Sequence, residues 1–510
     1  MNFEQAFDYV VIGAGSAGCV VANRLTTNSQ TRVLLLEAGG PDNNPDIHEP
    51  KKLLNLWGSD LDWKYFTTEQ PGLNGRQVMI TRGKVVGGCS SLYAMIYIRG
   101  NPRDFDHWNF LGNEGWSYQD VLPYFKKSER YEGGANEFHG GDGELWVRQS
   151  PNPTPVAPAF AQAAAELGYG GPDWDFNGSQ HENGGGLYQV NITPEGKRCS
   201  TAVAFLKPIL ARPNFIVKTG AQVSRILFSG NRAVGIEYIQ NGQIHQVKAE
   251  QEIIVCAGAF DSPKLLMLSG IGGAEELQNH GIEVVANLPG VGKNLQDHLL
   301  LPQTYKSKQP LPEPTFIAEA GLFVRTRDGM DAASPDLQYH FSAGIPAFAP
   351  PGFTDSAFVF VPILVQPQSR GEVSLRSGNW QDPPVINPNY LQCDADVETH
   401  LQGIKLTREL ANTKAFAEFY DGEVTPGSGK DDAELRQFIR NGVSTVWHPV
   451  GTCKMGYDAQ AVVDPQLRVH GIEGLRVADA SIMPTITSGN TNAACIMIGE
   501  KVADMITSGG

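Results

Sequence analysis

The chain has 510 residues, of which 41% are hydrophobic and 19% are charged. This composition is that of a folded globular protein, and the length predicts two domains or one large interrupted domain. A total of 40 basic against 55 acidic side chains gives a net charge of −15, which argues against nucleic acid or an anionic membrane as the main partner.

Seven cysteines are widely spaced along the chain and form no CxxC pair. This pattern predicts buried thiols in a reducing compartment rather than a disulfide framework or a zinc site. The N-terminus has no basic region followed by an apolar core, and no apolar run approaches the roughly 18 residues that span a bilayer. We therefore expect a cytoplasmic protein with no membrane span and no bound metal.

The first elements form a strand, a turn, a helix and a second strand in "FDYVVIGAGSAGCVVANRLTTNSQTRVLLLEAGG". Gly13 permits the tight turn, Gly15 lets a pyrophosphate approach the backbone, and Gly18 lets the helix pack closely on the strand. Glu37 ends the second strand, where a carboxylate can accept hydrogen bonds from an adenosine ribose and would repel a 2′-phosphate. The pattern predicts a dinucleotide site, argues against NADP, and does not distinguish FAD from NAD.

Two later stretches contain further glycine-rich turns. "TRGKVVGGCSSLYAMIYIRG", residues 81–100, holds a loop of small residues whose backbone N–H groups can bind an anion; a simple turn between strands is the alternative. "EIIVCAGAFDSPKLLMLSGIG", residues 252–272, predicts a strand, a turn and a short helix. We expect that helix to begin at Ser262, with Pro263 at its first position, and to stop at Gly270.

The C-terminal region predicts a strand and a final helix. "GLRVADASIMP" is typical of a strand that ends at Asp479. From Ala493 to Ile506, apolar and polar residues alternate at helical spacing, with Asn492 as the expected N-cap.

Six stretches together resemble the glucose-methanol-choline (GMC) oxidoreductase family. They are "GAGSAG", "GKVVGGCSS", "AGAFDSPKLLMLSGIG", "PGVGKNLQDH", "HPVGTCKMG" and "SGNTNA", and their order and spacing cover nearly the whole chain. The resemblance implies an α/β fold, α+β overall, with a Rossmann-type FAD-binding domain interrupted by a substrate domain built on an antiparallel sheet flanked by helices. It also favours FAD over NAD.

The same resemblance implies where the domains divide. The FAD-binding domain is expected to comprise residues 1–155, 198–300 and 441–510. The substrate-binding domain is expected to comprise residues 156–197 and 301–440.

It further implies which residues surround the cofactor. They are Gly13, Gly15, Ser16, Ala17, Gly18, Glu37, Ala38, Arg82, Gly83, Val86, Gly88, Cys89, Val223, Ala257, Trp447, Asp479, Ala480 and Thr491.

Flavin-dependent oxidation of an alcohol needs a base for the hydroxyl proton and a donor that stabilises the alkoxide, close to the flavin. A histidine suits the base because its ordinary pKa is about 6.5. His448 precedes Pro449, which directs its backbone toward an extended conformation, and Asn490 lies just before the final helix with an amide that can donate to the alkoxide. In the family, the base and its partner occupy the positions that match His448 and Asn490.

The substrate pocket is expected to include Glu319, His340, Trp447 and Tyr93. Glu319 and His340 resemble pocket positions of choline-oxidising members, where a carboxylate attracts a quaternary ammonium; a general polar role is the alternative. Trp447 would be a pocket wall or a neighbour of the flavin, and its "VWH" triplet resembles members that act on aromatic or furanic alcohols. His298 and His470 are expected to satisfy hydrogen bonds of loops.

Two positions depart from the family pattern. Tyr93 stands where many members have Asn or His, which puts a polar contact near the flavin in doubt. Leu92 stands where some members attach the flavin covalently through a histidine, so we expect non-covalent FAD.

The expected activity is FAD-dependent oxidation of a primary alcohol to an aldehyde, by proton abstraction and hydride transfer to flavin N5. The alcohol is aromatic, furanic or choline-like, and the electrons pass to dioxygen or to another acceptor. Two branches of the same fold remain as alternatives: an FAD-containing hydroxynitrile lyase and a light-driven fatty acid decarboxylase, although the presence of both His448 and Asn490 argues against the decarboxylase. No motif sets the oligomeric state.

Overall fold

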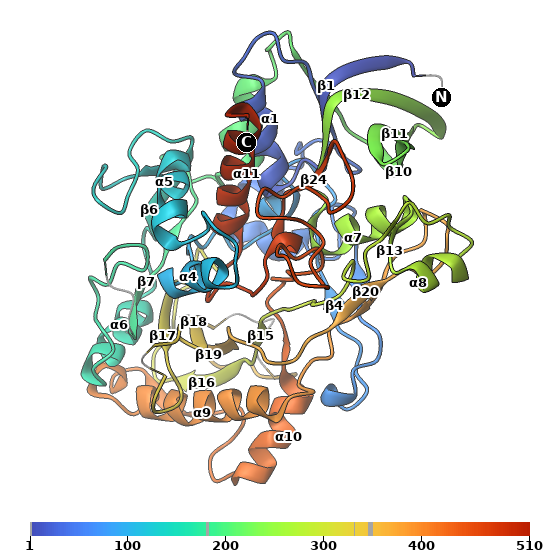
Figure 1. Ribbon diagram of the computed structural model, residues 1–510. Helices are drawn as coiled ribbons and strands as arrows, with labels where there is room; N and C mark the ends of the chain where they lie inside the picture. Colours follow the sequence, from blue (N-terminus) through green and yellow to red (C-terminus); the bar gives the residue numbers. More distant parts are fainter. Residues whose placement is uncertain (1–2, 180–182, 331, 345–349, 510) are drawn as a thin grey trace.

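A computed structural model describes residues 3–179, 183–330, 332–344 and 350–509. Two large sheets organise the chain (Figure 1): a seven-stranded mixed sheet and an eight-stranded antiparallel sheet. The expected combination of a Rossmann-type sheet with an antiparallel sheet flanked by helices is confirmed.

Five parallel strands form the centre of the seven-stranded sheet, in the order β9-β2-β1-β12-β24. They are β1 (Gln5–Ile12), β2 (Val33–Leu36), β9 (Phe215–Lys218), β12 (Gln243–Val255) and β24 (Leu475–Val477). The antiparallel strands β10 (Ala221–Ser229) and β11 (Arg232–Gln240) continue the sheet along the first half of β12. Because the carboxyl ends of parallel strands meet at one edge, this edge is where a dinucleotide is expected to bind.

The first and last helices pack side by side against this sheet (Figure 1). They are α1 (Ser16–Leu25) and α11 (Asn492–Thr507). Ser16 Oγ donates to Asn492 Oδ1 at 2.6 Å, and Arg24 pairs with the buried Glu500 at 2.6 Å. A Cβ at Gly499 would lie 2.8 Å from the carbonyl oxygen of Ala17, so this glycine permits the close approach. The contact brings the end of the chain to the turn that follows β1.

The antiparallel sheet has helices on one face and a cavity on the other. Its strands are β7 (Gly184–Leu187), β15 (Leu299–Leu300), β16 (Gln303–Ser307), β17 (Ala320–Val324), β18 (Leu337–Ala343), β19 (Ala357–Leu364), β22 (Tyr420–Glu423) and β23 (Ser444–Thr445). In β18, Tyr339 and Phe341 belong to the buried cluster that contains α6 (Val156–Glu166) and the end of α9 (Asp394–Ala411). Since side chains alternate along a strand, Gln338 and His340 face the opposite side.

The remaining elements connect these layers. The helices are α2 (Pro45–His48), α3 (Leu53–Leu56), α4 (Pro102–Phe110), α5 (Tyr118–Ser128), α7 (Gly258–Leu268), α8 (Ala274–Asn279) and α10 (Asp432–Gly442). The strands are β3 (Tyr65–Phe66), β4 (Met79–Ile80), β5 (Glu129–Tyr131), β6 (Leu145–Gln149), β8 (Gln189–Val190), β13 (Ile271–Gly272), β14 (Ala286–Asn287), β20 (Glu372–Ser374) and β21 (Val385–Asn387).

Helix α7 begins at Gly258, not at Ser262 as predicted, and Pro263 lies inside it. A proline inside a helix leaves the carbonyl four residues earlier without its usual donor. Here that carbonyl, of Ala259, accepts a hydrogen bond from Thr452 Oγ1 at 2.6 Å. A contact 193 residues away in sequence therefore compensates for the proline. The predicted stop is confirmed, since Gly270 follows the helix with a φ of +88°.

The N-cap of α11 is Thr491, not Asn492 as predicted. Asn492 is the first helical residue, and its side chain is the acceptor for Ser16. The domain division stays a prediction: β15 and β23 lie within the segments 198–300 and 441–510, yet both pair in the antiparallel sheet.

In the part of the chain that the structure describes, no helix is both long and apolar enough to span a bilayer. All seven cysteines are unpaired thiols.

His400 in α9 should weaken the fold at acidic pH. Its ring is fully buried, neither ring nitrogen has a hydrogen-bond partner among the described residues, and burial lowers its pKa to about 3. Below pH 6.5 the unfolded chain takes up a proton at this residue while the folded chain does not, so the free energy of unfolding falls by up to about 1.4 kcal/mol per pH unit. We expect His400→Leu to flatten the decline between pH 6 and pH 4, measured by urea unfolding.

The exposed His107 supplies the control, because His107→Gln should leave the pH dependence of unfolding as it is in the parent protein. An unchanged slope in His400→Leu would contradict this account of His400.

Candidate active site

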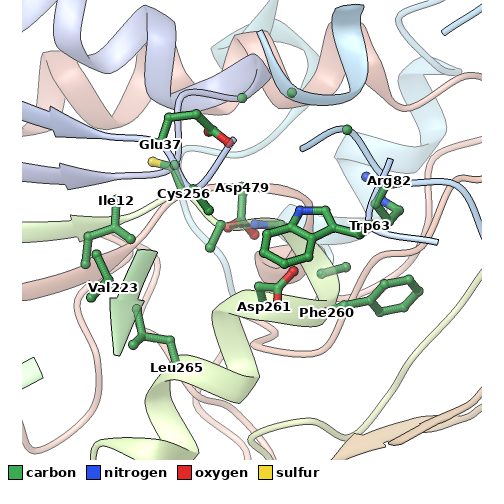
Figure 2. Close-up of a pocket in the computed structure, with 18 of the residues that line it drawn as sticks. Ile12, Glu37, Trp63, Arg82, Val223, Cys256, Phe260, Asp261, Leu265 and Asp479 are labelled. Atoms are coloured by element: carbon green, nitrogen blue, oxygen red, sulfur yellow. Dashed lines mark hydrogen bonds between the residues drawn. The ribbon is translucent and has the colours of Figure 1, made fainter. Parts of the chain in front are cut away.

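A first cavity lies at the carboxyl edge of the parallel strands, and Figure 2 shows Glu37 and Arg82 on opposite sides of it. Most of the predicted cofactor residues line it. They are Gly13, Gly15, Ser16, Ala17, Glu37, Ala38, Arg82, Gly83, Gly88, Cys89, Val223, Ala257, Asp479 and Ala480. The other four members of that prediction, Gly18, Val86, Trp447 and Thr491, do not line this cavity.

The glycines shape a cradle in front of α1. A Cβ at Gly15 would meet no atom within 4 Å, so this residue opens onto the cavity. A Cβ at Gly18 would lie 1.9 Å from the carbonyl oxygen of Gly13, and a Cβ at Gly88 would lie 2.7 Å from the Cα of Gly15. The helix therefore packs tightly on the turn, and its N-terminal backbone N–H groups are free to bind phosphate.

Glu37 is held rigidly at the end of β2. Its Oε2 accepts a hydrogen bond from the backbone N–H of Ala14 at 2.9 Å, and its Oε1 accepts one from Gly39 at 2.8 Å. Burial raises the pKa of this carboxyl to about 7 despite both bonds. Each oxygen keeps a second lone pair, which suits the hydroxyl groups of an adenosine ribose. The cradle and this carboxylate together fit the adenosine diphosphate half of a dinucleotide.

A second cavity adjoins the first. Six residues line both cavities: Ser16, Arg82, Gly83, Cys89, Ala480 and Cys495. The second cavity also contains His448 and Asn490, together with His340, Tyr93, Trp447 and Thr491. The structure thus brings the predicted catalytic pair together, beside the end of the first cavity that Arg82 lines.

A buried carboxylate holds the loop that carries His448. Asp297 Oδ1 accepts a hydrogen bond from the backbone N–H of His448 at 2.8 Å, and Oδ2 accepts from Tyr390 and Thr445 at 2.6 Å each. Trp447 has a φ of +62°, which is rare and strained for a bulky residue. Its carbonyl accepts from Arg82 Nη1 at 2.8 Å. The strained loop is therefore fixed at several points.

Both ring nitrogens of His448 have partners. Nε2 lies 3.4 Å from Asn490 Nδ2, and Nδ1 lies 3.0 Å from Nδ1 of His298. Gln338 Nε2 donates to Asn490 Oδ1 at 3.2 Å, which turns the amide so that its NH₂ group faces His448. Nε2 is then the acceptor and Nδ1 carries the proton, which it donates to His298. This tautomer leaves a basic lone pair on Nε2, toward Asn490.

Burial keeps these histidines neutral. It is the largest cause that lowers the pKa of His448 well below 6.5, followed by repulsion from the protonated forms of His298 and His340 and from the charge of Arg82. Burial also lowers the pKa of His298 to about 3 and that of His340 to about 4. At neutral pH, His448 is therefore unprotonated and able to accept a proton.

His298 interacts with the backbone at Val365 and Thr487, in keeping with the predicted loop role, but the contact of its ring with the ring of His448 was not predicted. The sequence signal was its place directly after Asp297, the residue that anchors the His448 loop. The corresponding prediction for His470 is confirmed, since its Nε2 lies 2.9 Å from the carbonyl oxygen of Gly456.

Glu319 does not line the second cavity, contrary to the sequence prediction. Its carboxylate accepts from the backbone N–H of Thr154 at 2.8 Å and from Thr154 Oγ1 at 2.5 Å, which directs it toward the start of α6. Tyr93 does line the cavity, and its hydroxyl donates to Asn191 Oδ1 at 2.7 Å. His340 lies there as predicted, 3.3 Å from Gln338 Nε2. In the described residues, no cluster of His, Cys, Asp or Glu could hold a metal ion.

Two family models described as GMC oxidoreductase match residues 7–300 and 367–499 of this chain. The chain belongs to the GMC oxidoreductase family. It is 44% identical to the mitochondrial choline dehydrogenase of Mus musculus, over 99% of this chain and 90% of that protein.

Two solved structures resemble the fold closely. Pyridoxine 4-oxidase from Mesorbium loti has a TM-score of 0.93 and 34% identity, over 98% of this chain and 99% of that one. Formate oxidase from Aspergillus oryzae, an enzyme that contains FAD, has a TM-score of 0.91 and 27% identity, over 100% of this chain and 99% of that one. This GMC oxidoreductase is thus a flavin-dependent enzyme that acts on alcohols, with FAD as its cofactor, as the sequence predicted.

Replacing Glu37 with glutamine should weaken FAD binding. An amide has one acceptor oxygen, so it can accept from Ala14 or from Gly39 but not from both. The loss of one buried hydrogen bond should raise the Kd for FAD about tenfold, measured by titrating apoprotein and following flavin fluorescence.

Glu319→Gln is the matched control, because Glu319 is also buried and both of its oxygens accept hydrogen bonds outside the first cavity. It should lower stability but leave the Kd for FAD unchanged. Equal FAD affinity in Glu37→Gln and the parent protein would remove Glu37 from the cofactor site.

Proposed function

We propose that this enzyme oxidises a primary alcohol to an aldehyde, with His448 as the base and Asn490 as the residue that orients the alcohol oxygen. The main support for this proposal is His448, which is neutral and directs its Nε2 lone pair toward the amide of Asn490. Both residues line the cavity that adjoins the dinucleotide cavity. When bound, FAD supplies the hydride acceptor at N5. The cofactor residues named above would hold it in the first cavity.

The proton of the substrate hydroxyl passes to Nε2 of His448. Its other nitrogen, Nδ1, keeps its proton and its hydrogen bond to His298, so the ring need not turn during the transfer. Asp297 holds the backbone of His448 in place throughout. A base that stays in position in this way loses little rate to reorientation.

Negative charge develops on the substrate oxygen as its proton leaves. The NH₂ group of Asn490 can donate to that oxygen, because Gln338 already occupies the amide oxygen. Thr491 and Asn492, at the N-terminus of α11, also line the cavity, so the positive end of this helix lies beside the developing charge. Both features favour the alkoxide over the alcohol.

The substrate and the electron acceptor belong to the same proposal. The relatives act on choline and pyridoxine, by their names, and both an aromatic or furanic alcohol and a choline-like alcohol are candidates. The acceptor is dioxygen or another oxidant. A cytoplasmic location is supported by the seven unpaired thiols, which suit a reducing compartment.

Replacing His448 with alanine should slow flavin reduction by a factor of about 10² or more, because it removes the proposed acceptor of the hydroxyl proton. FAD content should stay the same, since His448 does not line the first cavity. Anaerobic stopped-flow reduction by an alcohol substrate measures the rate, and absorbance measures the bound FAD. His470→Ala, in a loop outside both cavities, should match the parent protein. Unimpaired reduction by His448→Ala would remove the assignment.

FAD should be held without a covalent bond. Leu92 is buried among apolar residues at the position where some members attach the flavin, and a leucine offers no nucleophile. Precipitation of the protein with acid should therefore release the yellow cofactor into the supernatant. A yellow pellet after washing would show a covalent link.

A further inference from the structure

We propose that the second cavity selects an uncharged alcohol over an alcohol that carries a quaternary ammonium group. This inference rests on the proposed function and names its substrate class. It separates this chain from the choline dehydrogenase to which it is 44% identical.

Hydrophobic side chains form most of the wall of the second cavity. The aliphatic ones are Leu92, Ala94, Ile96, Leu300, Ile317, Val361 and Val446, and the aromatic ones are Trp57, Tyr93 and Trp447. Among the residues that the structure describes, no aspartate or glutamate lines this cavity, and Arg82 is the charged side chain that does.

A permanent cation would be unstable in this environment. A buried charge needs an opposite charge or hydrogen bonds to offset the loss of water, and a quaternary ammonium can neither donate a hydrogen bond nor lose its charge. The fixed charge at the cavity has the same sign as the cation. Burial is the largest cause of the lowered pKa of His448, and the positive charge of Arg82 lowers it further.

The nearby carboxylates are already engaged. Glu319 accepts both of its hydrogen bonds from Thr154 and lies outside the cavity wall. Asp297 accepts from His448, Thr445 and Tyr390 beneath the loop, and it too lies outside the wall. Neither can approach a substrate cation without giving up buried hydrogen bonds.

The aromatic residues of the wall also suit a neutral group. The rings of Trp57 and Trp447 lie with centroids 4.4 Å apart and planes tilted by 46°, so each covers part of the other's face. A cation–π contact needs an open face, whereas an aromatic or branched aliphatic group packs well on such a tilted pair. Trp57 Nε1 donates to the carbonyl of Leu92 at 3.0 Å, so its polar atom is already engaged within the protein.

Two alcohols of the same shape test the inference directly. Choline and 3,3-dimethylbutan-1-ol differ only in the nitrogen or carbon that carries three methyl groups. With the FAD-loaded enzyme under anaerobic conditions, we expect kred/Kd for flavin reduction to be about tenfold or more higher for the neutral alcohol, because the cation is desolvated without a counter-charge. Benzyl alcohol, as an aromatic probe, should also reduce the flavin.

An equal or higher kred/Kd for choline would overturn the selectivity and leave the proposed alcohol oxidation standing. If none of the three alcohols reduces the flavin, the proposed function itself fails, and the inference fails with it. The two failures are therefore distinguishable in one experiment.

A charge placed in the wall gives a second test. Ile317 lines the cavity and is only half-buried, so a polar residue there can reach water. Ile317→Glu should shift the ratio of the two kred/Kd values toward choline by about tenfold relative to Ile317→Gln, which has the same size and no charge. An equal ratio in both variants would contradict the electrostatic explanation. The measurement on the parent enzyme decides the selectivity even if a variant does not fold.

Discussion

The hydrogen bond from Ser16 to Asn492 joins the two ends of the chain where the two cavities meet. Ser16 begins the helix that follows the dinucleotide turn, and Asn492 begins the final helix, two residues after Asn490. Packing of these helices therefore places the amide that faces His448 beside the cofactor cavity. Without this long-range contact, the dinucleotide turn and the loop that carries Asn490 would be held by separate parts of the fold, and nothing would fix the distance between them.

Burial then decides the chemistry. His298, His340 and His448 share a site in which desolvation lowers every pKa, so none of them carries a charge at neutral pH. A neutral histidine can accept a proton only at the nitrogen that has no hydrogen, and the contacts with His298 and Asn490 select Nε2 for that role. The low pKa makes His448 a weak base on its own, so stabilisation of the alkoxide by Asn490 and by the N-terminus of α11 must supply part of the driving force.

The parts of the fold and of the site that could be predicted from the sequence are those held by contacts between residues close in sequence. The glycine turn and Glu37 lie in one strand–helix–strand unit, whose contacts are short-range, and the structure places them as expected in the first cavity. Contacts between distant segments were harder to predict. The hydrogen bond from Thr452 lets α7 begin before Pro263. The ring of His298 contacts that of His448, which lies 150 residues away in sequence. Glu319 has the residue type of a pocket carboxylate, but Thr154 turns it away, which no pattern near it indicates.

Arg82 affects both the catalytic base and the proposed substrate preference of this site. It donates to the carbonyl of the strained Trp447, which fixes the loop of the base, and its charge adds to the burial that lowers the pKa of that base. The same charge acts on any substrate that enters the cavity, because it lines the wall. A buried site with a positive charge disfavours the protonated form of His448, and it must also disfavour a cationic substrate unless a carboxylate in the wall offsets it. The engaged Glu319 and Asp297 do not provide that offset, so burial and the charge of Arg82 together account for the neutral base and for the proposed substrate preference.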